Sequence, residues 1–532
     1  MIRTASVVLL LLAAQIADSQ NFNNTGKEFV VVFPENIAYY HPTDPINEIW
    51  VTALHHNTRI TIEKLNIDYD HMSAGETTNY TTDLELKKPD IPENSTSLNV
   101  FSISDEAIKV TSTKDVVVQA ISLRKNSVQY APVIPSHKLG TKYFIPPVPG
   151  LEESPDDGAV VVNVTERGPF RLIIVNPGED QANVTIKGEE EFGGAIEPGK
   201  VAQILLNNNG QYQYVEADRP VAVFLSHPCA FQDNCTCGLL HAMVPAAKDD
   251  KEEFLIPPIL AEQASILLSD EKSRTSTDST AAVDSEGTVI LHKPSFLLTL
   301  MSKKDFGSCF VLTSLRYLIK SFHIVVHKDD KNGIYIGRNP AGYTDWEELK
   351  GTDYVSTHVS VTFPKAFLWH NSSVMAVYLV GEKNGRMYGN PAPVVSSIPD
   401  YRGCVVTPEV IEILDEEKGW KESIKSCETK HLDLISLSDN RLQKQLCSKI
   451  SAKGVKEAWI GTRRSSLTGD WYWLNYNKFN DTNWAPGKPG KKDQGQCAVM
   501  SLKPDDDCSW KDKNCCDAIR PFCYKPPEFL PM

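Results

Sequence analysis

The sequence lacks a second long apolar run. After the N-terminal segment, no stretch of about 20 apolar residues occurs in the 532 residues, so we expect no membrane span. Residues 529–532 also form no hydrophobic tail of the kind that signals a lipid anchor. The one apolar run, residues 7–14 after Arg3, is too short to cross a bilayer and is followed by the small residues Ala17 and Ser19. It predicts a signal peptide over residues 1–19 and a secreted, extracellular protein.

The chain also lacks an excess of basic residues. It has 54 Lys and Arg against 68 Asp and Glu, a formal net charge of -14. Because phosphate binding needs a basic surface, we expect no nucleic-acid partner. Catalytic motifs are missing as well: there is no Gly-x-Ser-x-Gly, no phosphate-binding glycine loop and no His-Glu-x-x-His. The chain is therefore predicted to be a binding protein and not an enzyme.

Secretion implies that the twelve cysteines are oxidised. They form an even set of four and an even set of eight: Cys229, Cys235, Cys237 and Cys309, then Cys404, Cys427, Cys447, Cys497, Cys508, Cys515, Cys516 and Cys523. Eight Asn-x-Ser/Thr sequons behind a signal peptide predict an extracellular glycoprotein: Asn23, Asn79, Asn94, Asn163, Asn183, Asn234, Asn371 and Asn480.

One cluster has the residue types of a zinc site: His227, Cys229, Cys235, Cys237 and His241 fall within fifteen residues. In an oxidising compartment disulfides are favoured, and no metal is predicted here. Cys235 and Cys237 are too close in sequence to pair comfortably. We expect one of them to pair with Cys229 and the other with Cys309.

Residues 27–398 contain a weak internal repeat. Each unit opens on an aromatic, aliphatic and proline cluster such as Phe254-Leu255-Ile256-Pro257-Pro258, and closes on a β-branched strand followed by an apolar-proline segment. Repetition at the length of a domain indicates duplicated domains. Short period-two runs separated by Gly, Pro, Asn and Asp favour antiparallel β-sandwiches. We predict three β-sandwich-like units: 27–137, 141–248 and 251–398.

The same region resembles the N-terminal domain of the IgGFc-binding protein family. The resemblance lies in the segments Glu28-Phe29-Val30-Val31, Arg219-Pro220-Val221-Ala222-Val223-Phe224 and His227-Pro228-Cys229-Ala230. It covers about residues 27–398 and implies a secreted, mucus- or matrix-type interaction domain. No residue transfers antibody Fc binding to this chain.

The pattern changes after residue 410. Asp415 is expected to cap a helix in which Trp420, Ile424 and Cys427 share one face, and a second helix should follow Ser438. Strand-like runs then continue to residue 524. Two helices followed by short strands predict an α+β domain at 401–525 after the mainly β part.

The order of tryptophans and cysteines over 401–525 resembles a C-type lectin-like domain: Trp420, Cys427, Trp459-Ile460-Gly461, Trp484, Cys497, Trp510-Lys511-Asp512, Cys515 and Cys523. The resemblance implies the disulfides Cys427–Cys523 and Cys497–Cys515, and core positions for Trp459, Trp473 and Trp510. Cys404, Cys447, Cys508 and Cys516 lie outside that pattern, and we expect two further bridges among them whose pairing stays open.

Calcium-dependent lectins of this family carry acids or amides on both sides of a proline in the long loop. This chain has Lys488-Pro489-Gly490 there, Gly495 where an acid is expected, and Lys511 beside the one retained acid, Asp512. Calcium needs six to eight oxygen ligands, and a lysine ammonium supplies none. No calcium cofactor is therefore expected in the usual site.

Two other uses of this surface stay open. Asp493, Asp505, Asp506, Asp507 and Asp512 form either a different cation site or a solvated acidic turn. Lys488, Lys491, Lys492, Lys511 and Lys513 form either a basic rim for sulfated glycans, anionic surfaces or proteins, or a solvated cluster. Tyr472 and Trp484 are the aromatics kept as possible surface contacts. The ligand-binding candidates are Trp484, Lys488, Asp493, Lys511 and Asp512.

We expect a recognition protein that binds a glycan or an extracellular protein, and the family resemblance implies innate defence at a mucosal or body surface. The alternative is a structural matrix or mucus adhesion protein that reads no sugar.

Overall fold

The computed structural model describes residues 23–531, except 38–43, 88, 90–100, 125–126, 149–169, 189–190, 207–212, 234–235, 263, 269–273, 276–280, 294–295, 316–317, 384–385, 451–454, 480–482, 492, 494 and 504–505. The chain divides into two compact units. The first comprises residues up to Val406 together with 529–532, and the second is Thr407–Glu528. The predicted signal peptide lies outside the described residues.

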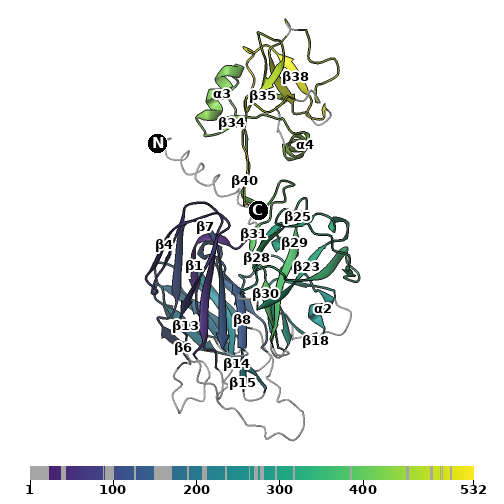
Figure 1. The fold of residues 1–532 in the computed structure, drawn as a ribbon. Coiled ribbons are helices and arrows are strands. Elements are labelled where there is room, and N and C mark those ends of the chain that lie inside the picture. The colour runs from purple at the N-terminus through teal and green to yellow at the C-terminus, as the bar shows by residue number, and fades with distance from the viewer. Residues whose placement is uncertain are drawn as a thin grey trace. The chain divides into compact units, whose positions relative to one another are not determined.

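Two antiparallel sheets form the first half of the larger unit (Figure 1). The first has the order β4-β3-β7-β2-β5, with β1 and β8 also on β7: β1 Thr25–Val31, β2 Ile46–Ala53, β3 Thr58–Ile62, β4 Ile67–Met72, β5 Thr77–Thr82, β7 Ile108–Arg124 and β8 Ser127–Pro132. The second has the order β12-β11-β14-β10-β13-β6, with β9 and β15 also on β14: β6 Phe101–Ser104, β9 Gly140–Ile145, β10 Arg171–Val175, β11 Ala182–Lys187, β12 Glu191–Ile196, β13 Val201–Leu205, β14 Gln213–Asp233 and β15 Thr236–Val244.

Residues 252–396 form four further sheets. Two small ones contain β16 Glu252–Leu255 with β19 Ala282–Ser285, and β18 Arg274–Thr275, β17 Ser265–Leu268, β20 Val289–Lys293 and β21 Phe296–Thr299. One five-stranded sheet runs β25 Asn339–Pro340, β24 Ile334–Ile336, β28 Lys365–His370, β22 Cys309–Thr313 and β31 Val394–Ser396. The other runs β26 Glu347–Glu348, β27 Tyr354–Ser360, β23 Ile319–His327, β29 Met375–Lys383 and β30 Arg386–Pro391. The short helix α2 spans Pro258–Ala261.

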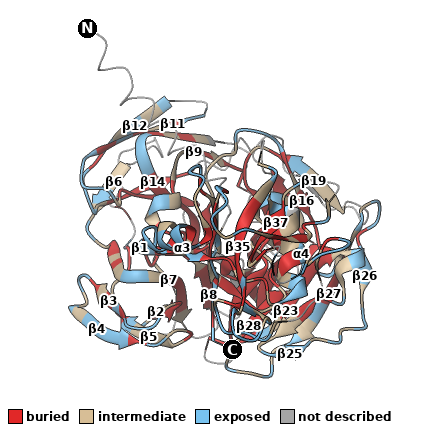
Figure 2. Ribbon diagram, turned by 90° about the horizontal axis from the view of Figure 1, so that it is seen from above, coloured by how far each residue is buried: buried red, intermediate tan, exposed pale blue. Residues whose placement is uncertain are grey.

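Burial explains which sequence patterns became which strands. β3 alternates buried and exposed or half-buried positions, as a strand with one covered face requires, whereas all five residues of β13 are buried. Figure 2 shows buried residues along β8, and exposed ones on β4 at the end of the first sheet.

The cores of the larger unit are shared between the predicted repeat units. Phe29 and Val118 of the first sheet lie in one cluster with Ile173 and Phe224 of the second. A second cluster joins Tyr130 to residues 254–394. Each predicted closing strand does turn back on itself, in the hairpins β7–β8, β14–β15 and β29–β30. The structure is thus mainly β, but the layout of three separate units is not confirmed.

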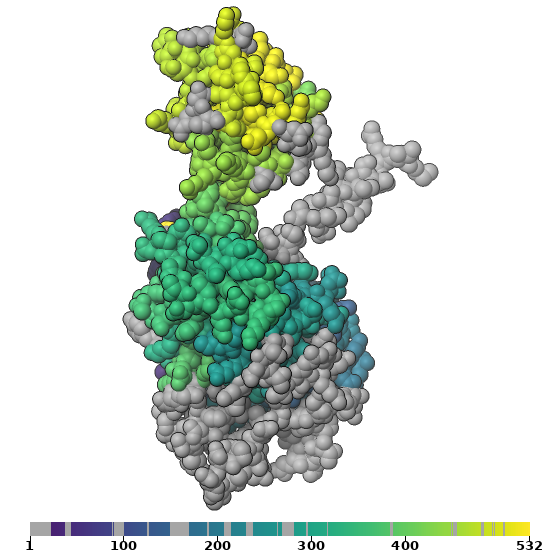
Figure 3. Space-filling view, turned by 90° about the vertical axis from the view of Figure 1, so that its right-hand side faces the viewer, coloured from purple at the N-terminus to yellow at the C-terminus, as the bar shows by residue number. Residues whose placement is uncertain are grey.

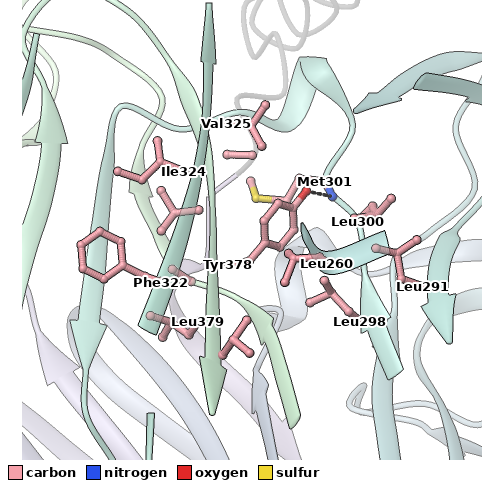
Figure 4. Packing of buried hydrophobic residues seen from close by; sticks show 14 of the residues in the cluster. Leu260, Leu291, Leu298, Leu300, Met301, Phe322, Ile324, Val325, Tyr378 and Leu379 are labelled. Carbon is pink, nitrogen blue, oxygen red and sulfur yellow. Dashed lines mark hydrogen bonds between the residues drawn. The ribbon is translucent and has the colours of Figure 1, made fainter. Parts of the chain in front are cut away.

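Tyr378 shows how the largest cluster is packed (Figure 4). Its ring is fully buried close to Leu260 and Leu298, and its hydroxyl accepts a hydrogen bond from the Met301 backbone N–H at 3.1 Å. A buried phenol needs such a partner, because an unpaired hydroxyl costs about 1–3 kcal/mol. The bond ties β29 to the segment that follows β21.

The smaller unit has two helices and two sheets. They are α3 Trp420–Glu428, α4 Asn440–Lys449, the sheet β33 Val410–Ile413, β39 Phe522–Lys525 and β34 Asp433–Leu434, and the sheet β36 Trp471–Trp473, β35 Glu457–Arg464, β37 Cys497–Ser501 and β38 Trp510–Lys513. A further pair joins β32 Val405–Thr407 to β40 Glu528–Phe529. Segments early and late in the unit lie side by side, as in the β33–β39 pair. In Figure 3, green atoms from the earlier part of the unit and yellow atoms from its later part lie on the same face.

Two local expectations were wrong. Asp415 does not cap α3: the helix begins after Gly419, and no side chain caps it. Cys309 does not pair within residues 229–309 but forms a disulfide with Cys404, 95 residues away. This bond joins a cysteine of the set of four to a cysteine of the set of eight. The fold brings the two cysteines together: β22 pairs with β31, where Cys309 faces Ser396, and Cys309 and Cys404 lie in one buried cluster.

Candidate ligand-binding site

Three disulfides brace the smaller unit. The two that the family resemblance implied are present: Cys427–Cys523 joins α3 to β39, and Cys497–Cys515 joins β37 to the turn after β38. A third, Cys447–Cys508, fastens α4 to the chain before β38. Of the two further bridges expected among Cys404, Cys447, Cys508 and Cys516, this one is present. The second is not, because Cys404 pairs with Cys309 and Cys516 is a free, exposed thiol.

One cysteine of the cluster in the larger unit is disulfide-bonded. Cys229 is disulfide-bonded, and its backbone N–H donates to Nδ1 of the buried His227 at 3.0 Å. Its expected partners lie outside the description: Cys235 is not described, and neither is the side chain of Cys237. His241 is buried with its ring stacked on Phe224 at 5.3 Å.

Four tryptophans of β36, β38 and the long loop pack against one another, where the long loop is residues 474–496 between β36 and β37. Trp473 and Trp510 are fully buried and meet edge to face at 5.2 Å, as the core prediction required, and Trp459 is buried as well. Trp484 packs on Trp471 at 4.7 Å and on Trp510 at 5.8 Å. Trp484, a ligand-contact candidate, is therefore part of this aromatic cluster and only half-buried.

Lys488 and Asp512 form an ion pair. The Lys488 Nζ lies 2.8 Å from Asp512 Oδ1, and the Asp512 side chain is 0% exposed. Burial opposes ionisation of this carboxyl, but the Lys488 ammonium outweighs it and holds the pKa of Asp512 below its usual value. Asp512 is therefore charged and compensated by a lysine from the loop.

The same stretch of loop is held from a second strand. The buried Arg464 of β35 donates from Nη2 to the Gly490 carbonyl oxygen at 3.0 Å, and its guanidinium lies 5.0 Å from the centre of the Trp471 ring. The loop is thus held at Lys488 by an acid on β38 and at Gly490 by a base on β35.

The other candidate charges are also in use. Lys511 pairs with Asp506 at 2.9 Å, and Lys513 pairs with Glu457 at 2.7 Å. Asp506 also accepts a hydrogen bond from the Ser501 hydroxyl at 2.6 Å, and Asp493 is exposed. Lys492 and Asp505 lie outside the described residues. Two of the candidate lysines, Lys488 and Lys511, are thus paired with two of the candidate acids, Asp512 and Asp506.

The described residues do not fit a calcium ion. No group of three or more His, Cys, Asp or Glu side chains able to hold a metal exists in the described part of the chain. A Cβ added at Gly495 would lie 2.9 Å from Asp512 Oδ2, so this position leaves no room for an acid beside the Asp512 carboxylate. The oxygen-rich shell that calcium requires is absent from these positions.

Sequence reasoning missed two exposed apolar side chains. Leu467 and Tyr476 are each 94% exposed, and Tyr472 of β36 is 40% exposed. All three lie on or next to the β35–β36 hairpin. The signal was a leucine inside a polar turn, Ser465-Ser466-Leu467-Thr468-Gly469, where burial is not expected.

Comparison with known proteins identifies this unit. Residues 416–525 match the family model described as the lectin C-type domain. Residues 416–525 form a C-type lectin domain. Similar proteins include E-selectin of Sus scrofa, 26% identical over 133 residues, and C-type lectin domain family 4 member K of Mus musculus, 30% identical over 117 residues. These matches cover 22% and 20% of this chain and 27% and 33% of the relatives.

The lectin domain is the part of the chain that these comparisons cover. The chain thus spans about a quarter to a third of the length of these relatives. Among solved structures, human lithostathine is 19% identical, with 22% of this chain and 92% of that chain covered and a TM-score of 0.21. The resemblance of residues 27–398 to the IgGFc-binding family stays a prediction. Among the described residues, no helix is long and apolar enough to cross a bilayer.

Proposed function

We propose that this chain is an extracellular recognition protein whose C-type lectin domain binds a carbohydrate or protein ligand without calcium. The observation that carries the proposal is the lectin domain at 416–525, in which a lysine ion pair takes the place of calcium ligands. Relatives with this domain include a murine receptor fragment described in complex with an N-glycan. The domain is therefore the part of the chain that we propose to bind the ligand.

The β35–β36 hairpin is the proposed contact surface. Tyr476 is an exposed aromatic held at φ 59°, a conformation that non-glycine residues rarely adopt. Tyr472 is the cross-strand neighbour of the exposed Arg463. Together with Leu467 these side chains offer the Tyr, Arg and apolar character of binding hot spots, and Tyr rings also stack on sugars. Trp471 and Trp473 of β36 pack on Trp484 and Trp510, which joins this hairpin to the core of the unit.

An extracellular location is supported by the bonded cysteines and by the sequons. The described residues contain four complete disulfides, which persist in oxidising compartments. Asn79 and Asn183 are exposed, and Asn23 and Asn371 are partly exposed, as glycosylation requires. The other four sequons, Asn94, Asn163, Asn234 and Asn480, lie outside the described residues. A role in innate defence at a mucosal surface is part of the proposal.

The full chain should be screened on a glycan array and against extracellular proteins, in calcium and in chelator. We expect binding that survives the chelator. Binding that disappears with calcium would contradict the proposal, and the absence of any glycan or protein ligand would favour a structural adhesion role.

A matched pair of variants tests the contact surface. Leu467→Ser with Tyr476→Ser removes two side chains that are each 94% exposed and should weaken binding about tenfold or more. Val410→Ser removes a side chain that is 42% exposed in the other sheet of the same unit and should change binding little. Equal effects of the two changes would rule out the hairpin as the contact surface.

A further inference from the structure

An ion pair between two side chains of the protein, Lys488 and Asp512, holds the long loop of the lectin domain on the sheet. The loop backbone is attached to β38 at two points: the Asn483 carbonyl accepts a hydrogen bond from the Trp510 N–H at 2.8 Å, and the Ala485 N–H donates to the Trp510 carbonyl at 2.9 Å. Three residues later the Lys488 N–H returns to the Ala485 carbonyl at 2.9 Å, which closes a turn. That turn places the Lys488 ammonium on Asp512.

Each group in this network supports the next. Asp512 is fully buried on β38, and a buried carboxylate is costly unless it is paired. Lys488 compensates its charge, and neither oxygen of the Asp512 carboxylate has a hydrogen-bond partner among the described residues. Arg464 of β35 donates to the Gly490 carbonyl oxygen at 3.0 Å. The loop from 485 to 490 is therefore tied to both β38 and β35.

A divalent cation would have to do the same two things: neutralise Asp512 and hold the loop against the sheet. The geometry points to Lys488 as a tethered cation that performs both tasks permanently, so that the loop keeps its binding conformation without calcium. This inference rests on the proposed function for its biological meaning, and it adds how the site is regulated: its shape and its ligand affinity do not respond to free calcium.

Lys511 provides a matched control. Its Nζ lies 2.9 Å from Asp506, nearly the same distance as in the Lys488–Asp512 pair, but Asp506 is 31% exposed whereas Asp512 is 0% exposed. An exposed carboxylate that loses its lysine is solvated by water, whereas a buried one is left uncompensated. The two lysines therefore separate a surface ion pair from a structural one.

The test is amide hydrogen exchange of peptides that cover residues 484–491 in the full chain. In the wild type we expect the same exchange rates in millimolar calcium and in chelator. Lys488→Met should speed exchange of the loop at least about tenfold, and Lys511→Met should leave it unchanged. Loop exchange that slows in calcium, or equal behaviour of the two variants, would overturn the inference.

A double variant keeps the test decisive if Lys488→Met alone fails to fold. Lys488→Met with Asp512→Asn leaves no uncompensated charge and should be protected better than Lys488→Met alone. A double variant no better than the single one would contradict the charge argument. Because exchange needs no ligand, this result stands apart from the search for a ligand: a calcium-insensitive loop with no ligand found would defeat only the proposed function.

Discussion

We predict that removing the Cys447–Cys508 disulfide lowers the free energy of unfolding more than removing Cys497–Cys515 does. It joins α4 to the chain before β38 and closes a sequence separation of 61 residues. The Cys508 carbonyl oxygen also accepts hydrogen bonds from Gln443 of α4 at 3.4 Å and from Asn483 of the long loop at 3.0 Å. Replacing both cysteines by alanine should therefore loosen the helix and the loop together.

The magnitude follows from the length of the closed loop. Chain entropy gives about 4 kcal/mol for a separation of 61 residues and about 3 kcal/mol for the 18 residues of Cys497–Cys515. The double alanine variant at 447 and 508 should thus lose more stability than the one at 497 and 515, although the second bridge belongs to the pattern that the family shares.

Urea unfolding followed by tryptophan fluorescence measures this loss. Six of the nine tryptophans lie in residues 407–528, so the signal reports mainly on the lectin unit. The control is Cys516→Ser, which changes a free, exposed thiol and should alter the free energy of unfolding by about 0.5 kcal/mol or less. A loss below about 1 kcal/mol for the Cys447–Cys508 pair, or the reverse order of the two bridges, would refute the reasoning.

Three further predictions use other features. Gly495→Ala should cost about 1–3 kcal/mol in urea unfolding, because its Cβ would lie 2.9 Å from Oδ2 and 3.0 Å from the backbone carbon of Asp512; an unchanged midpoint would refute this. Burial lowers the pKa of His241 to about 3, so below pH 6.5 the unfolded chain binds a proton that the folded chain does not, and stability falls as the pH falls toward 3. At pH 5 this costs about 2 kcal/mol, and His241→Phe, which keeps the ring on Phe224, should remove that part of the pH dependence. Iodoacetamide should label Cys516 without prior reduction, as peptide mass spectrometry would show; an unlabelled Cys516 would contradict its free, exposed state.

Local sequence patterns predicted the local structure well. The i, i+4, i+7 spacing of Trp420, Ile424 and Cys427 corresponds to α3, and the helix after Ser438 is α4. Such spacing depends only on the helical period, which near neighbours define. The alignment of tryptophans and cysteines also placed Trp473 and Trp510 in the core, because large indoles are buried wherever the fold offers space.

Charge partners were not predictable in the same way. The sequence presented Lys488, Lys511 and the aspartates as two clusters of like sign, a basic rim and an acidic turn. The structure pairs them across strands and loops, because an ion pair depends on distance in space and on burial. The exposure of Leu467 and Tyr476 could not be predicted either, because it depends on which parts of the fold cover each side chain.

The sequence by itself determined the kind of module at the C-terminus and the loss of its calcium oxygens, since both depend on residue identity at set spacings. The tertiary structure alone decided what replaced them. Only folding brings Lys488 to the buried Asp512, Arg464 to Gly490, and Cys309 to Cys404, 95 residues away. Residue types state which interactions are chemically available, whereas the packing of strands and loops selects the ones that form.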